Sequence, residues 1–364
     1  MRNVGPLSSG ASDSFRRRRG RVGLKLRSTV AAYVVLTFSA SIAIRGQENM
    51  VLVQTGSSMP EPLYKSWIDA YHKETASTEI RYMPVGSAES ARNILAGSGD
   101  LGGGDAPIPE TQLRAAGKTI LELPTVLIGI VAIYELPGVN GELKLTGPVL
   151  ANIFLGKIKV WNDPAITRLN PDMRFPSLPI RVFHRTDGKG SNYILSDYLC
   201  KVSPEFLAVA GRDESPKWPV GQGFQRSQEL VNQLHSTPGA IGYTELNLAV
   251  SSGVHMASIK NAAGEFIKPS SQTIAAAASA GGGKKNDDFR VSLTNAPGKE
   301  SYPISSFTWL YVPAAASDPG RGRAVGSYLK WIYTSGQNFA KEQGYATLPA
   351  GVLAKVAAKA ATVR

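Results

Sequence analysis

Short apolar runs alternate along the chain with longer segments of helical periodicity. The run MVLVQ at 50–54 predicts a strand, and the segment after it places Leu63, Trp67 and Tyr71 four residues apart, as on one face of a helix. EIRYMPV at 79–85 predicts a second strand, which a turn and another helical pattern follow. This order of strand, turn and helix predicts an α/β fold in which a mainly parallel sheet is flanked by helices.

Two long apolar runs interrupt this alternation. TVLIGIVAIYEL at Thr125–Leu136 is too long and too apolar for an edge strand, and it suits a buried strand that passes between two lobes. SSFTWLYVP at Ser305–Pro313 could carry the chain back to the first lobe, and the tail from Gly320 to Arg364 has the pattern of helices. With 364 residues, 43% of them apolar, the chain is long enough for one or two lobes with large cores.

The net charge is concentrated at the N-terminus. The chain has a formal charge of +12, and residues 1–43 carry eight Lys and Arg against one acidic residue, a net of +7. The remaining +5 is spread without a long basic run, so nucleic-acid binding is a poor interpretation. Cys200 is the only cysteine of the sequence, which excludes an intramolecular disulfide.

The first 43 residues have the organisation of a secretory signal. The basic stretch FRRRRGRVGLKLR precedes an uncharged segment from Ser28 to Ile44, and Ser41 and Ala43 offer the small residues that a signal peptidase reads. The 17 uncharged residues are close to the shortest membrane span, so an uncleaved anchor stays open. Residues 1–43 are therefore predicted as a signal peptide or N-terminal anchor, and the protein is expected in the periplasm or cell envelope.

Four polar turns are candidates for a ligand site. RTDGKGSN at 185–192 lies between an apolar run and a helical one, and Ser58, Ser87 and Asp105 also follow predicted strands. In open α/β sheets, ligands bind outside the carboxyl ends of the strands, where helix N-termini present free N–H groups. Arg185 would add a charged fork that suits a tetrahedral oxyanion. Together the four turns predict an anion site.

Each of these residues also has a purely structural interpretation. Ser58 and Glu61 have the spacing of a capping box, and Arg185 with Asp187 could be an exposed ion pair of little consequence. Capping and anion binding are compatible, because both use the same free N–H groups. The other candidates could be simple caps of helices or turns: Ser87, Asp105 and Ser191.

Asp105 is informative because a carboxylate repels an anion unless that anion has a proton to donate. Near neutral pH, phosphate keeps at least one P–OH group and sulfate keeps none. A carboxylate acceptor would therefore favour phosphate, because sulfate would leave lone pairs facing lone pairs at a cost of roughly 1–3 kcal/mol or more. Asp105 thus predicts a site that selects phosphate over sulfate.

The turns and their flanking segments resemble the periplasmic phosphate-binding proteins of phosphate-specific ABC transporters. The resemblance covers nearly all of the chain after the signal and rests on TGSSMPEPLYKSWIDAYHKET, PVGSAES, GDLGGGDAPIP, LGKIKVWNDPAITRLNP, RTDGKGSN, PKWPVGQG, PGAIGYTE, YPISSFTWLYV and YATLP. It implies a two-lobed type II periplasmic-binding-protein fold, each lobe a mainly parallel sheet flanked by helices, with two hinge crossovers. The first lobe would comprise 47–128 and 302–364, and the second 129–301.

The resemblance also implies a function. The protein would be a monomeric receptor that captures inorganic phosphate between its lobes and delivers it to the membrane permease of an ABC transporter. Closure about the two crossovers would let the permease distinguish the loaded receptor from the empty one.

Carried over residue by residue, the resemblance assigns the ligand site to nine positions. Asp105 would accept the phosphate proton, Arg185 would clamp the anion, and Asp187 would hold Arg185 in place. Lys189 stands where the family usually has a serine, so an ammonium group that either contacts the ligand or turns to solvent replaces a neutral donor. The remaining hydroxyl and backbone donors would come from Ser58, Met59, Ser87, Gly190 and Ser191.

Two other functions stay open on the residues alone. A phosphate-ester hydrolase would need a nucleophile with a base, or a metal cluster. The four histidines lack metal-ligand spacing, and only His184 lies near the proposed site, where it could pair with Ser58. A receptor for another oxyanion, such as sulfate or molybdate, would conflict with Asp105. We therefore expect a binding protein without catalytic residues, metal, cofactor or nucleic-acid partner.

Overall fold

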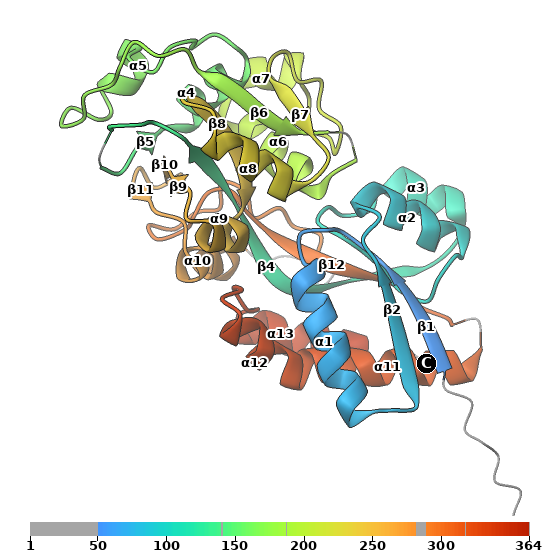
Figure 1. Cartoon of the computed structure of the whole chain (residues 1–364). Helices are drawn as coiled ribbons and strands as arrows, with labels where there is room; N and C mark the ends of the chain where they lie inside the picture. The colour runs from blue at the N-terminus through green and yellow to red at the C-terminus, as the bar shows by residue number, and fades with distance from the viewer. Residues whose placement is uncertain (1–49, 140, 187, 282–288, 317, 364) are drawn as a thin grey trace, which may run out of the picture. The chain divides into compact units, whose positions relative to one another are not determined.

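The computed structural model describes residues 50–139, 141–186, 188–281, 289–316 and 318–363 (Figure 1). The predicted signal at 1–43 and the predicted ligand-site residue Asp187 lie outside these ranges. Within them, no helix is both long and apolar enough to cross a membrane.

The first strands and helices follow the order that the hydrophobic pattern predicts. β1 (Met50–Thr55) leads into α1 (Glu61–Glu74), and β2 (Thr78–Met83) leads into α2 (Ser87–Ala96). β1 and β2 pair in parallel along their whole length, and β3 (Gly102–Gly104) lies next to β1 through an isolated parallel bridge at its start. The turns that follow these strands therefore lie at one edge of the sheet.

Two long strands join the two groups of strands. β4 (Ile120–Tyr134) and β12 (Ser305–Pro313) are almost entirely buried, pair antiparallel and run side by side in Figure 1. β4 pairs with β12 as far as Gly129, and from Ile130 onward it pairs with β8 (Ala240–Glu245). The predicted passage of Thr125–Leu136 from one group of strands to the other follows from this change of partner.

The second group of strands carries the remaining candidate turn. β6 (Arg181–Arg185) pairs in parallel with both β7 (Gln222–Phe224) and β8, so the large sheet has the order β3-β12-β4-β8-β6-β7. Past its carboxyl end, each of these three parallel strands leads into a helix. The helices are α6 (Gly190–Val202) after β6, α8 (Ser227–His235) after β7 and α9 (Leu246–Ser252) after β8.

The C-terminal tail forms the helices that its pattern predicts. α11 (Pro319–Trp331), a π-helical turn (Ile332–Gly336), α12 (Gln337–Glu342) and α13 (Ala350–Ala360) succeed one another and contact β1, β4 and α1. Trp67 of α1 is fully buried among them, and its Nε1 donates a hydrogen bond to Gly336 O at 2.8 Å. The tail therefore shares a core with α1, β1 and β4.

The other described elements are short and connect or cover the main strands. They are α3 (Glu110–Ala116), β5 (Lys144–Leu145), α4 (Gly147–Phe154), α5 (Pro164–Thr167), α7 (Pro204–Val209), β9 (His255–Met256), β10 (Ser258–Lys260), β11 (Phe266–Ile267) and α10 (Ser271–Gly281).

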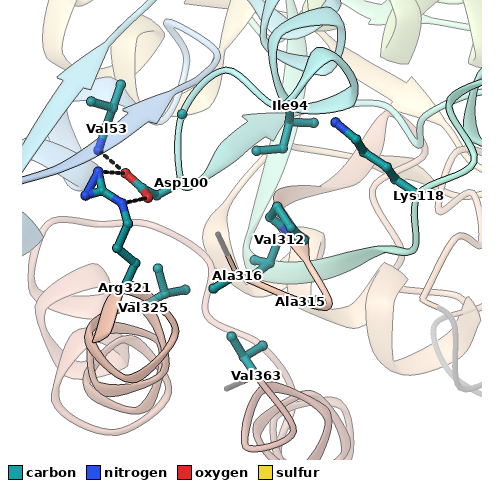
Figure 2. Close-up of a pocket in the computed structure, with 13 residues that line it drawn as sticks. Val53, Ile94, Asp100, Lys118, Val312, Ala315, Ala316, Arg321, Val325 and Val363 are labelled. Carbon is teal, nitrogen blue, oxygen red and sulfur yellow. Dashed lines mark hydrogen bonds and ion pairs between the residues drawn. The ribbon is translucent and has the colours of Figure 1, made fainter. Parts of the chain in front are cut away.

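An ion pair attaches α11 to the first strand beside an apolar cavity of about 390 Å³ (Figure 2). Arg321 Nε lies 2.8 Å from Asp100 Oδ1, and Nη2 lies 3.2 Å from Oδ2 and 3.0 Å from Val51 O. Asp100 Oδ2 also accepts the backbone N–H of Val53 at 2.8 Å. The two side chains thus connect α11, β1 and the turn before β3.

We expect Arg321→Ala to lower the free energy of unfolding by about 2 kcal/mol, because Asp100 would lose its counter-charge in a mostly buried place. The measurement is chemical denaturation followed by circular dichroism. Lys65→Ala is the matched control, since its pair with Glu61 is an exposed i,i+4 contact that contributes less than about 0.5 kcal/mol. Equal losses in both variants would contradict the prediction.

Candidate functional site

Asp105 lies fully buried just after β3. Ser87 Oγ, at the start of α2, donates to Asp105 Oδ2 at 3.2 Å and accepts the N–H of Asp105 at 3.2 Å. Burial raises the pKa of Asp105 to about 6, although hydrogen bonds with Ser57, Thr308 and Ser87 oppose the shift. Two of the four predicted turns therefore meet at one carboxyl group.

The N-terminus of α6 contacts this carboxyl group from the second lobe. A Cβ added at Gly190 would lie 2.5 Å from Asp105 Oδ2 and 2.7 Å from Ser87 Oγ, closer than real Cβ atoms approach. The turn before α6 lies next to the turn before α2 as well, because a Cβ at Gly86 would lie 3.2 Å from Gly188 O. Only a glycine at position 190 allows the two helix N-termini to approach this closely.

Two buried oxygens at this contact lack a hydrogen-bond partner in the described part of the chain. They are Oδ1 of Asp105 and Oγ of Ser191, the second residue of α6. Buried polar atoms are normally satisfied, so the two oxygens mark a place for a polar ligand. The first N–H groups of a helix have no partner within it, which adds donors beside these oxygens. The place therefore suits an anion that also carries a proton.

Arg185 lies at the end of β6 with its guanidinium held from one side. The side chain is 2% exposed, Nε donates to Phe224 O at 3.2 Å, and Nη2 donates to Gln225 O at 2.6 Å. Nη1 donates to Ser227 Oγ. Of the five N–H donors, these contacts occupy three, and one on each Nη is left for a ligand.

The turn after β1 places two neighbouring serines in different environments. Ser58 is exposed and, with Met59, lines a cleft of about 940 Å³, whereas Ser57 is 3% exposed and is the group that most strongly opposes the rise of the Asp105 pKa. Ser57 Oγ also accepts the N–H of Met59 at 3.2 Å. Sequence reasoning missed Ser57, and its only available signal was its place in the same strand-to-helix turn.

The alternative interpretation of the serines as simple N-caps is wrong. The N-cap residues of α1, α2 and α6 are Pro60, Gly86 and Lys189, and none of the three makes a side-chain cap. Ser87 and Ser191 instead lie inside the first turn of their helices. Their hydroxyls therefore need another explanation.

Comparison with known proteins identifies the family of the chain. A model of the PBP superfamily domain matches residues 39–335. The phosphate-binding protein PstS of Pasteurella multocida is 34% identical over 334 residues, which covers 92% of this chain and 95% of that protein. The chain belongs to the PstS family.

Other members of the PstS family and a solved structure agree with this assignment. PstS of Xylella fastidiosa is 34% identical over 304 residues, 83% of each chain. The structure of a phosphate-binding protein from Stenotrophomonas maltophilia matches with a TM-score of 0.65 at 17% identity, over 85% of this chain and 93% of that one. The predicted fold class, a two-lobed α/β fold of the periplasmic-binding-protein type, is confirmed.

The structure places Lys189, whose side chain was expected either to contact the ligand or to turn to solvent, on the cleft wall. Its backbone N–H donates to Glu214 O at 3.1 Å, and its Nζ would lie 3.8 Å from a Cβ at Gly86, across the contact between the two turns. Burial lowers the pKa of Lys189, and the charge of Arg185 lowers it further. The ammonium group is therefore turned toward the contact between the lobes.

A hydrolase would need a metal cluster, or a nucleophile with a base such as His184. Among the described residues, no group of three or more His, Cys, Asp or Glu could hold a metal ion. His184 Nδ1 hydrogen-bonds to Arg185 O at 3.0 Å, and its ring stacks on Trp218 at 5.4 Å. These contacts give His184 a structural role.

Proposed function

We propose that this protein captures inorganic phosphate between its two lobes outside the cytoplasm and delivers it to the permease of an ABC transporter. The observation that carries the proposal is Asp105, a fully buried carboxylate with one unpartnered oxygen beside the N-terminus of α6. The PstS relatives are named for phosphate binding, and this carboxylate is the feature that distinguishes phosphate from a fully ionised oxyanion.

The proposed site combines donors for the phosphate oxygens with one acceptor for its proton. Asp105 accepts the P–OH proton, and Arg185 contributes the two remaining N–H donors of its fork. Lys189 adds a second positive charge, and Asp187, which lies outside the described residues, would hold Arg185 in place. The other donors are those of Ser58, Met59, Ser87, Gly190 and Ser191, together with Ser57 as a support of Asp105.

The cellular setting is part of the proposal. Residues 1–43 would export the chain and either be removed or remain as an anchor, so that the folded part works in the periplasm or cell envelope. The lobes would be 47–128 with 302–364, and 129–301, and would close as a monomer about β4 and β12. Binding without chemistry fits relatives that are named as binding proteins.

Calorimetry tests the proposal directly. The purified protein, stripped of bound anion, is titrated with phosphate and then with sulfate near neutral pH. We expect one-to-one binding of phosphate and no response to sulfate. Absence of phosphate binding, or equal binding of sulfate, would overturn the proposal.

The two neighbouring serines are expected to act differently. Ser57→Ala removes a hydroxyl that lowers the pKa of Asp105. Phosphate affinity should therefore fall about tenfold, and the acid limit, the pH below which phosphate binding is lost, should move to higher pH. Ser58→Ala removes only a donor on the cleft wall, so affinity should fall without a shift of that limit. Titrations from pH 5 to pH 8 separate the two effects; a shift of the acid limit in Ser58→Ala alone would contradict the prediction.

A further inference from the structure

A hydroxyl bridge links Arg185 to a carboxylate of the second lobe. Ser227 Oγ accepts a hydrogen bond from Arg185 Nη1 and donates to Glu245 Oε2 at 3.0 Å, where Thr244 Oγ1 also donates at 3.0 Å. A serine hydroxyl has a single proton, so its donation to Glu245 leaves its lone pairs for the guanidinium. The bridge therefore has a fixed direction, from the cation to the carboxylate.

The fold explains why these three residues meet. Arg185 ends β6 and Glu245 ends β8, and the two strands pair in parallel, so both side chains start at the same edge of the sheet. Ser227 is the first residue of α8, is 9% exposed, and lines the same cleft as Glu245. The bridge thus borders the cleft from which phosphate would enter.

The charges on the bridge are complementary. Burial lowers the pKa of Arg185, and among the groups that oppose this shift Glu245 has the largest influence. A buried cation needs a partner, and Glu245 provides one without touching the guanidinium. The hydroxyl between them keeps the carboxylate from occupying the N–H groups that an anion would use.

We propose, on the basis of the proposed phosphate binding, that Ser227 and Glu245 are positioning residues that hold the Arg185 fork toward the ligand. Without the bridging hydroxyl, Arg185 would turn to form a direct ion pair with Glu245, and its N–H donors would leave the site. The sequence predicted Asp187 as the partner of Arg185, and Asp187 lies outside the described residues. The bridge consists of other residues, all of which the structure describes. Neither Ser227 nor Glu245 needs to contact phosphate itself.

Phosphate titration of the full chain and its variants tests the bridge. Ser227→Ala is expected to weaken phosphate binding about 10- to 100-fold, and Glu245→Gln about tenfold, because each removes a hydrogen bond to a charged group. Ser227→Thr keeps the hydroxyl and should bind within about threefold of the wild type. Ser236→Ala, at the other end of α8, is the matched control and should bind phosphate as the wild type does.

A double-mutant cycle separates positioning from a general structural effect. In an Arg185→Lys background, Ser227→Ala should cause little further loss, because the fork that the bridge holds is already missing. The inference would be overturned, provided that the wild type binds phosphate, by either of two results. One is an equal loss of phosphate affinity from Ser227→Ala in both backgrounds, and the other is wild-type affinity in Ser227→Ala and Glu245→Gln. If Ser227→Ala does not fold, as judged by its thermal transition, Glu245→Gln in the two backgrounds decides in the same way. A wild type that does not bind phosphate would instead refute the proposed function.

Discussion

Gly190→Ala is expected to weaken phosphate binding about 100-fold while leaving the fold intact. In the described arrangement, the new Cβ would lie 2.5 Å from Asp105 Oδ2, 2.6 Å from Asp105 Cβ and 2.7 Å from Ser87 Oγ. Neither neighbour can yield easily, because both side chains are at most 1% exposed and bonded to each other. α6 would have to retreat from the first lobe, and such overpacking costs about 1–3 kcal/mol. Calorimetric titration with phosphate measures the loss.

The expected loss is specific to the contact between the lobes. Gly190 is the first residue of α6 and does not have a positive φ, so alanine fits its backbone and favours the helix slightly. The unfolding midpoint should therefore stay within a few degrees of the wild type. Gly351→Ala is the matched control, because Gly351 lies in α13 with open space at its Cβ. Wild-type affinity in Gly190→Ala would mean that the lobes do not come this close when phosphate is bound.

The hydrophobic pattern was sufficient to locate β4 and β12 because strands buried on both faces have no polar position to interrupt the run. It could not reveal that the two strands pair antiparallel, since their direction depends on the path of the chain between them. The same pattern located α1 and the C-terminal helices, whose apolar positions recur with helical spacing. The pairing of β4 first with β12 and then with β8 depends on tertiary structure, so the local sequence pattern could not predict it.

One contact of the proposed site was predictable from the turns that hold it. The ends of parallel strands identify Ser87, Asp105 and Arg185 as neighbours, and the structure brings Ser87 and Asp105 into hydrogen-bond contact. The choice between Ser57 and Ser58 was beyond the sequence, because adjacent residues of a turn can point to opposite sides. The local pattern favoured Ser58 through its spacing to Glu61, and that capping box does not form.

Glu245 could have been found from the sequence by the rule that ligands bind at the carboxyl ends of parallel strands. It ends β8 in the segment PGAIGYTE, so its place at the carboxyl edge of the sheet was available from the sequence. Ser227 was not, because it follows a strand of only three residues that has no clear hydrophobic pattern. The position of such a short strand is set by its pairing with neighbouring strands, and its own sequence does not reveal that pairing.

Replacement of Asp105 is expected to change which anion the protein binds. In Asp105→Asn, the side-chain amide can donate to a fully ionised oxyanion, so sulfate binding should appear and the preference for phosphate over sulfate should fall about 100-fold. Asp105→Leu offers neither donor nor acceptor and should weaken phosphate binding by a similar factor without a gain for sulfate. Parallel titrations with the two anions near neutral pH give both numbers. Stability should change little in Asp105→Asn, because Ser87 can still hydrogen-bond to the amide.

Acid should imitate the asparagine variant, because the pKa of Asp105 is about 6 in the free protein. Above that pH the carboxylate accepts the phosphate proton and repels sulfate; below it the protonated acid becomes a donor, so sulfate binding should rise as the pH falls toward 5. Glu214 is a partly buried carboxyl group whose pKa is raised to about 7 by desolvation, so Glu214→Gln serves as the control. The acid-induced binding of sulfate should persist in Glu214→Gln and be absent from Asp105→Leu. Asp105→Leu could instead gain sulfate binding in acid as the wild type does. Another group would then accept the proton of the ligand, and the carboxylate of Asp105 would not face the anion.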